Sequence, residues 1–62
     1  MTSDEAELST VATQIDELMA RVTEVAERHR GTERDDVAIR LFDVERSLRT
    51  ATRSLSAALR VY

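Results

Sequence analysis

The sequence predicts an all-α protein, an antiparallel two-helix hairpin of the coiled-coil type that dimerises into a four-helix bundle. Apolar residues recur at alternating spacings of three and four along both halves of the chain, which is the heptad pattern of packed helices. The one glycine lies near the middle of the chain, and there is no proline. With 62 residues the chain is also too short to bury a large core by itself.

The first helix is expected over about residues 3–30. Its apolar seam occupies heptad positions a and d: Leu8, Val11, Ile15, Leu18, Val22, Val25 and His29. Thr2 or Ser3 is placed to cap the N-terminus, and the acidic residues that follow suit the positive end of the helix dipole. Gly31 follows the last turn and suits the left-handed conformation that often ends a helix.

The second helix is expected over about residues 33–61, after a turn at residues 31–32. Its seam has the same spacing: Val37, Leu41, Val44, Leu48, Ala51, Leu55, Ala58 and Tyr62. So short a connection requires the helices to fold back antiparallel, which brings Val22 near Leu41. Four i,i+4 ion pairs are expected: Glu17–Arg21, Glu24–Arg28, Asp36–Arg40 and Glu45–Arg49.

A second apolar face is expected beside the seam, at the e positions of both helices. We name this set the e face: Ala12, Met19, Ala26, Ala38, Glu45, Thr52 and Leu59. Two helices bury too little apolar surface to offset the entropy of ordering them. The e face is therefore predicted to pack against a second copy as a homodimer, with docking onto a different protein or a marginally stable monomer as the alternatives.

Two large apolar residues, Ile39 and Phe42, lie at f and b positions near the hairpin tip, outside both apolar faces. We name them the tip patch. In one interpretation Phe42 folds over the tip and covers Val25 or the methylenes of Arg21. In the second, Ile39 and Phe42 form a small exposed patch that docks a partner protein. A contact within a higher-order bundle is the third interpretation.

Arginines interleaved with serine and threonine line the outer face of the second helix. We name them the arginine stripe: Arg46, Arg49, Arg53 and Arg60. Residues 46–62 contain no acid, and guanidinium groups suit phosphate, so a nucleotide or nucleic acid is the alternative ligand. The net charge of −3 and the lack of a stacking aromatic residue on this face favour a solvated face instead.

Catalytic, cofactor-binding and metal sites are not expected. The chain has no cysteine and one histidine, His29, which we expect to pack in the seam or to act as a cation at the helix C-terminus. Glu45 is the one acid on an apolar stripe. We expect it to pair with Arg46 or Arg49 and to fix the register of the dimer.

No segment of the sequence resembles a signal peptide or a membrane span. The N-terminus is acidic rather than basic, and no apolar run approaches the roughly 20 residues that a span needs. A cytoplasmic location is therefore expected. The sequence favours a non-enzymatic protein–protein interaction module, such as an adaptor, scaffold or regulatory subunit, that acts through an apolar helical face. The alternative is a regulator that binds a nucleotide or nucleic acid through the arginine stripe.

Overall fold

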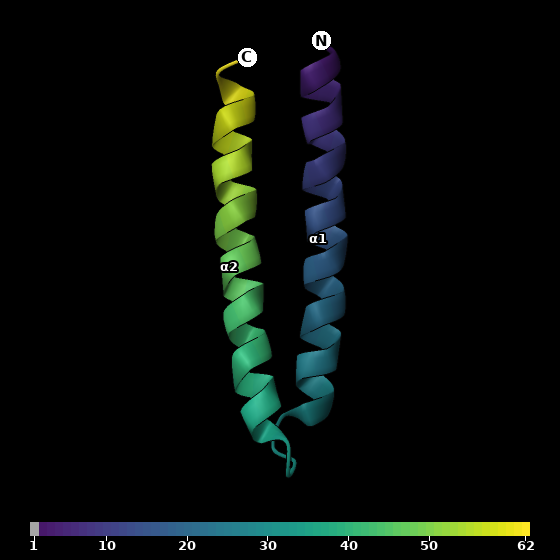
Figure 1. Cartoon of the computed structure of the whole chain (residues 1–62), viewed down its shortest axis with the longest axis vertical. Helices are drawn as coiled ribbons and strands as arrows, with labels where there is room; N and C mark the ends of the chain where they lie inside the picture. Colours follow the sequence, from purple (N-terminus) through teal and green to yellow (C-terminus); the bar gives the residue numbers. More distant parts are fainter. Residues whose placement is uncertain (1) are drawn as a thin grey trace.

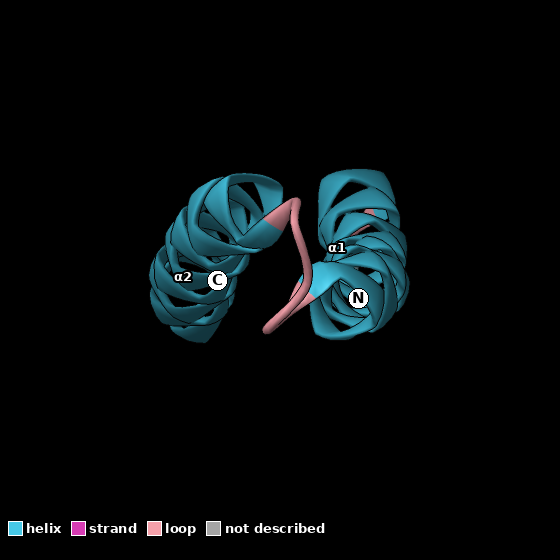
Figure 2. Cartoon of the chain, turned by 90° about the horizontal axis from the view of Figure 1, so that it is seen from below, coloured by secondary structure: helices cyan, strands magenta, loops and turns pink. Residues whose placement is uncertain are grey.

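A computed structural model describes residues 2–62 as two antiparallel helices joined by a short loop (Figure 1). Helix α1 spans Ser3–His29 and helix α2 spans Asp35–Arg60. The helices lie side by side, with both chain ends at one end of the rod and the loop at the other (Figure 1, Figure 2). The Cα atoms extend 48 Å along the rod and 14 and 9 Å across it. The expected all-helical hairpin is confirmed.

Helix α1 begins with a capping box. The Thr2 hydroxyl accepts a hydrogen bond from the Glu5 backbone N–H at 3.1 Å, and the Thr2 N–H donates to the Glu5 carboxylate at 3.2 Å. Thr2 is therefore the N-cap, one of the two candidates in the sequence. Asp4 and Glu5 also place negative charge on the first turn, where the helix dipole stabilises it.

The connection between the helices is longer than the turn expected at residues 31–32, because both helices end short of it. Helix α1 stops at His29, and Gly31 adopts a left-handed conformation with φ of +74°. Arg30 is the C-cap, so Gly31 occupies the position where such a conformation commonly ends a helix. This glycine reverses the chain direction without a Cβ penalty.

Side-chain hydrogen bonds hold the residues before Asp35 in a loop, so α2 begins at Asp35. The Thr32 hydroxyl donates to the His29 carbonyl at 2.6 Å and accepts from the Arg34 N–H at 3.1 Å. The Asp35 carboxylate accepts from the Gly31 N–H at 2.7 Å. These contacts satisfy loop groups locally, so the chain turns before the second helix begins.

The core of the hairpin is thin. Among residues 2–62, Ala26 and Ala38 alone are fully buried, with 0% and 1% of their surface exposed. They come from different helices and both lie in the half of the rod nearer the loop. Larger apolar side chains are half-buried or exposed. The stability of a helix in a protein comes mostly from packing. Since so few side chains are buried between these two helices, a single hairpin gains little stability from packing.

Candidate protein-interaction site

The two helices pack against each other through their a and e positions, an arrangement we call closure on a and e. Ala26 and Ala38, the two buried residues, are both at e. Every member of the e face is buried or half-buried: Ala12, Met19, Ala26, Ala38, Glu45, Thr52 and Leu59. The e face therefore lies between α1 and α2. Its expected placement on the outside of the hairpin, opposite a seam of a and d positions, is wrong.

The width of the apolar stripe explains this difference. Each helix is apolar at a, d and e, so the sequence permits closure on a and d or on a and e. Closure on a and e puts the small side chains of Ala26 and Ala38 between the helices, which lets the backbones approach closely. It also carries the neighbouring b positions to the margin of the interface, where Phe42 packs in a half-buried position. The position of Phe42 next to the e face is the sequence signal that favours this closure.

Two polar side chains are enclosed as a consequence. The Glu45 side chain is only 14% exposed, and its carboxylate lies 2.5 Å from the Arg49 guanidinium, which confirms one of the two expected pairings. The Thr52 hydroxyl is buried and has no hydrogen-bond partner within residues 2–62. Because Glu45 and Thr52 are polar, the e positions do not look like core positions in the sequence.

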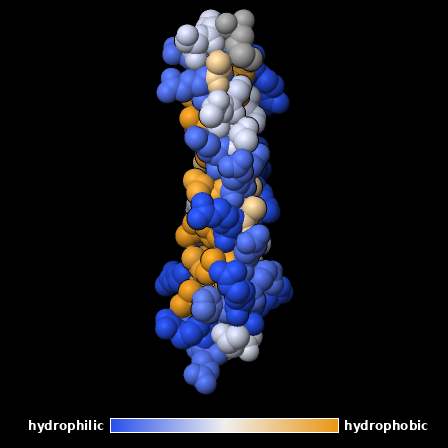
Figure 3. All heavy atoms as spheres, turned by 90° about the vertical axis from the view of Figure 1, so that its right-hand side faces the viewer, coloured by the Kyte–Doolittle hydropathy of each residue, from blue (hydrophilic) through white to orange (hydrophobic). Residues whose placement is uncertain are grey.

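The d positions form an apolar strip along one long edge of the hairpin. We name it the d edge: Val11, Leu18, Val25, Val37, Val44, Ala51 and Ala58. Leu18 is 48% exposed and Val44 is 43% exposed. Figure 3 looks at the hairpin from the side of α1 and shows a largely hydrophilic surface with hydrophobic atoms gathered along one edge. Closure on a and e therefore leaves Leu18, Val44, Ala51 and Ala58 exposed to solvent, while Val11, Val25 and Val37 are half-buried.

An open hollow of about 310 Å³ lies on the d edge, between the helices. It is lined by Leu18, Arg21, Val22, Val25 and Leu41. Val22 of α1 and Leu41 of α2 thus lie side by side, in agreement with the expected register. The lining is mostly aliphatic, so the hollow suits an aliphatic side chain of a partner.

Three arginines beside the d edge have no ionic partner among residues 2–62. Arg21 and Arg28 of α1 and Arg40 of α2 occupy g positions, which adjoin the d positions on a helix. Of the four expected i,i+4 pairs, Glu45–Arg49 is formed and the other three are not. Within residues 2–62, these three guanidinium groups make no ion pair and remain available to a partner.

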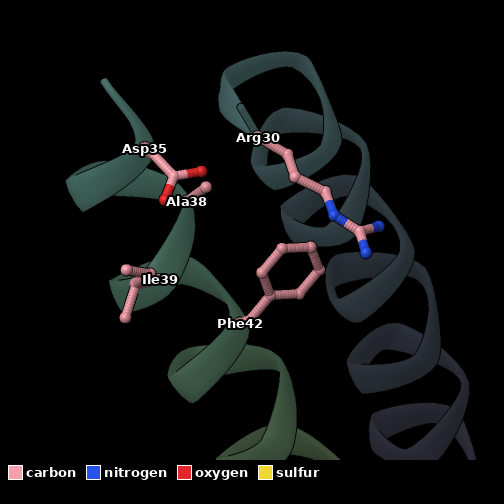
Figure 4. A pocket seen from close by; sticks show the side chains of 5 residues that line it. All are labelled: Arg30, Asp35, Ala38, Ile39 and Phe42. Atoms are coloured by element: carbon pink, nitrogen blue, oxygen red, sulfur yellow. The ribbon is translucent and has the colours of Figure 1, made fainter. Parts of the chain in front are cut away.

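The tip patch lies near the loop, on the b and f side of the hairpin (Figure 4). Ile39 is 59% exposed. Phe42 is half-buried, and the Arg30 guanidinium lies over its ring, 5.9 Å from the ring centroid. The Arg30 guanidinium therefore covers one face of the Phe42 ring. A hollow of about 360 Å³ adjoins this pair, lined by Arg30, Asp35, Ala38, Ile39 and Phe42.

The charged groups of the tip hollow already have partners within the chain. The Arg30 guanidinium lies 3.2 Å from the Glu27 carboxylate, and the Asp35 carboxylate accepts from the Gly31 N–H. Ile39 is the exposed apolar residue among those that line the tip hollow. An apolar group of a partner is the ligand that this hollow favours.

The arginine stripe is partly neutralised by acids of its own helix. Two ion pairs are formed within it: Arg46–Asp43 and Arg49–Glu45. Arg53 and Arg60 make no ion pair within the described chain. An open hollow of about 340 Å³ on this face includes Asp43, whose carboxylate repels phosphate. Within the described chain the stripe thus offers two guanidinium groups without an ion pair, seven residues or about 10 Å apart.

No cluster of chemically reactive side chains accompanies these surfaces in residues 2–62. His29 is half-buried in the last turn of α1. Across the described residues, no three histidine, aspartate or glutamate side chains are grouped so as to hold a metal ion. Neither α1 nor α2 has a stretch that is long and apolar enough to cross a bilayer.

Comparisons with known proteins do not indicate a function, so a functional conclusion depends on the fold and the surfaces described above. No protein-family model, curated protein or solved structure matches this chain. The structure itself defines the class: a two-helix hairpin with an exposed apolar edge and a second hollow at its tip.

Proposed function

We propose that this chain is a non-enzymatic protein–protein interaction module that self-associates through the d edge into a four-helix bundle. The d edge takes the role first expected of the e face, because the e face is enclosed within the hairpin. Two hairpins that meet d edge to d edge bring four helices around one shared core.

The observation that carries this proposal is an almost absent core beside an exposed apolar edge. In residues 2–62, Ala26 and Ala38 alone are fully buried, whereas Leu18 and Val44 keep nearly half of their surface in solvent. Each Å² of apolar surface covered contributes about 25 cal/mol, so a partner on the d edge supplies stabilisation that one hairpin lacks. A two-fold interface pairs the d edge of one copy with the d edge of the other. A second copy of the chain is therefore the simplest partner to cover this edge.

Sedimentation equilibrium at micromolar chain concentration tests self-association. The wild-type chain is expected to be a dimer, and Leu18→Glu is expected to be monomeric because it would bury an unpaired carboxylate in the interface. Ala20→Glu is the matched control, since Ala20 is exposed on the same helix at an f position. This control should remain dimeric. A folded wild-type monomer, or a Leu18→Glu variant as dimeric as the wild type, would contradict the proposal.

The tip patch supports a separate contact with a larger partner protein, as expected of an adaptor. Ile39 is exposed beside the hollow at Phe42, on the side of the hairpin away from the d edge. Ile39→Asp is therefore expected to leave the dimer intact in sedimentation while it removes the apolar surface at the tip. A dimer weakened by Ile39→Asp would show that the tip belongs to the self-association surface instead.

The arginine stripe has less support as a nucleotide or nucleic-acid site. Two of its four members are ion-paired, and within residues 2–62 Arg53 and Arg60 are the two that make no ion pair. Binding of a fluorescently labelled oligonucleotide, followed by anisotropy at low and high salt, distinguishes the two functions. Phosphate binding would weaken steeply with salt and with Arg53→Ala. We expect no such binding.

A further inference from the structure

The α1 half of the d edge is symmetric about Leu18. Val11 and Val25 lie seven residues before and after it, about 10.5 Å along the helix axis. A two-fold axis that crosses α1 at Leu18 therefore places Val11 of one copy opposite Val25 of the other. The two Leu18 side chains then meet at the axis.

The same two-fold axis also passes near the midpoint of the d positions of α2. Val22 and Leu41 line one hollow, so they lie at about the same level along the rod. Because the helices are antiparallel, the residue four positions before Val22, Leu18, is level with the residue four positions after Leu41, Glu45. The α2 half of the d edge is centred between residues 47 and 48, which is within one helical turn of that level. Both helices can therefore pack against their own counterparts in a second copy, each pair antiparallel.

The charges beside the d edge follow the same symmetry. The g positions of α1 change from acidic to basic along the helix: Glu7, Gln14, Arg21 and Arg28. In an antiparallel pair of helices the g positions face one another. An axis at Leu18 brings Glu7 of one copy near Arg28 of the other, and Gln14 near Arg21. Within residues 2–62 of one chain Arg21 and Arg28 make no ion pair, so the partner's groups can meet them.

The other two-fold arrangement, with both loops at the same end, is unfavourable in charge. It sets α1 of one copy against α2 of the other, so that Arg40 of the second copy lies level with residue 23 of α1, between Arg21 and Arg28 along the rod. Arg21 lies toward the same end, and the axis doubles all three charges. Six arginines beside one interface repel one another, and no acid at a g position is nearby to balance them.

From these observations we propose that the partner on the d edge is a second copy of this chain with its loop at the opposite end of the bundle. The two-fold axis passes through Leu18, and Glu7–Arg28 pairs close the interface at both ends of α1. This inference rests on the proposed function, because it specifies the geometry of the self-association proposed there.

Single-cysteine cross-linking tests the position of the axis. The chain has no cysteine, so each introduced thiol is the only one present. Leu18→Cys is expected to form a disulfide-linked dimer readily under mild oxidation, since only residues near the axis bring their own copies within disulfide reach. Val25→Cys alone should cross-link at least about tenfold more slowly, whereas a mixture of Val11→Cys and Val25→Cys chains should cross-link to each other. Val25→Cys cross-linking faster than Leu18→Cys overturns the inference.

Charge reversal tests the pairing at the ends of α1. Glu7→Arg and Arg28→Glu are each expected to weaken the dimer about tenfold in Kd, because attraction becomes repulsion at two symmetric sites. The double variant, which exchanges the two charges, should return close to the wild-type Kd. Both substitutions oppose the helix dipole, so recovery in the double variant cannot come from the helix alone. With loops at the same end, Arg28→Glu would instead tighten the dimer.

The two proposals fail in different ways. A wild-type chain that sediments as a folded monomer overturns self-association itself, and the arrangement with it. A wild-type dimer that resists cross-linking at Leu18 and is tightened by Arg28→Glu overturns only the placement of the loops at opposite ends.

Discussion

The guanidinium of Arg30 lies over the ring of Phe42, 5.9 Å from its centroid, and joins the end of α1 to the first turns of α2. The contact closes the interface on the side opposite the d edge. It depends on closure at a and e positions, because Phe42 lies at the b position next to them. Arg30 and Phe42 thus help to select which apolar edge of the hairpin is left open.

Phe42→Ala is expected to lower the free energy of unfolding by about 2 kcal/mol, since it removes a half-buried ring from the interface margin. Arg30→Ala should cost less, about 0.5–1 kcal/mol, because the cation–π contact lies at an exposed site. Urea unfolding followed by circular dichroism, at one fixed chain concentration, measures both. Equal losses from the two variants would contradict the dominance of ring packing.

Ala26→Leu tests the closure on a and e positions. Ala26 is 0% exposed, so a larger side chain must push the helices apart, and we expect a loss of about 1–3 kcal/mol in the free energy of unfolding. Ala20→Leu makes the same change at an exposed position of α1 and should be nearly neutral. If Ala26→Leu were as mild as this control, the helices would not meet at Ala26.

Thr52→Val is expected to stabilise the chain by about 1 kcal/mol. The Thr52 hydroxyl is buried without a hydrogen-bond partner in the described chain, and valine has nearly the same shape without the polar group. Thr50→Val is the control, since Thr50 is exposed and its hydroxyl donates to the Arg46 carbonyl at 3.2 Å. Thermal unfolding of both variants should show a higher midpoint for Thr52→Val alone.

Gly31→Ala is expected to cost about 1 kcal/mol in the free energy of unfolding. Apart from Gly31 and its two chain neighbours, no described residue has an atom within 4 Å of the added Cβ, so the cost arises from the left-handed backbone, where φ is +74°. Gly31→Asn should cost less, because asparagine tolerates this conformation better than alanine. A neutral Gly31→Ala variant would mean that the loop can reverse in another way.

The sequence predicts the two helices and their antiparallel packing well because heptad spacing and the single glycine are local signals. It does not predict which pair of heptad positions closes the hairpin. With apolar residues at a, d and e, closure on either side of the stripe buries a similar set of aliphatic side chains. The difference depends on Phe42 at the interface margin and on Ala26 and Ala38 between the helices, which are relations between two segments rather than features of one.

The candidate interaction surface shares this difficulty. Heptad spacing identifies its residues as apolar seam positions, but it predicts Leu18 and Val44 inside the hairpin and Ala26 and Ala38 outside it. The sequence predicts a loop of only two residues, because hydrogen bonds such as that from the Gly31 N–H to Asp35 cannot be read from spacing. The Glu45–Arg49 pair was predicted correctly, since partners one turn apart on a helix need no tertiary information.

Both chain ends emerge together at the end of the rod remote from Gly31 (Figure 1). Packed helices have axes about 8–10 Å apart, so polypeptides fused before Thr2 and after Tyr62 would start out as neighbours. Halves of a split reporter joined to the two ends would therefore reassemble within a single chain. Their signal would report closure of the hairpin independently of chain concentration, and so separate folding from assembly.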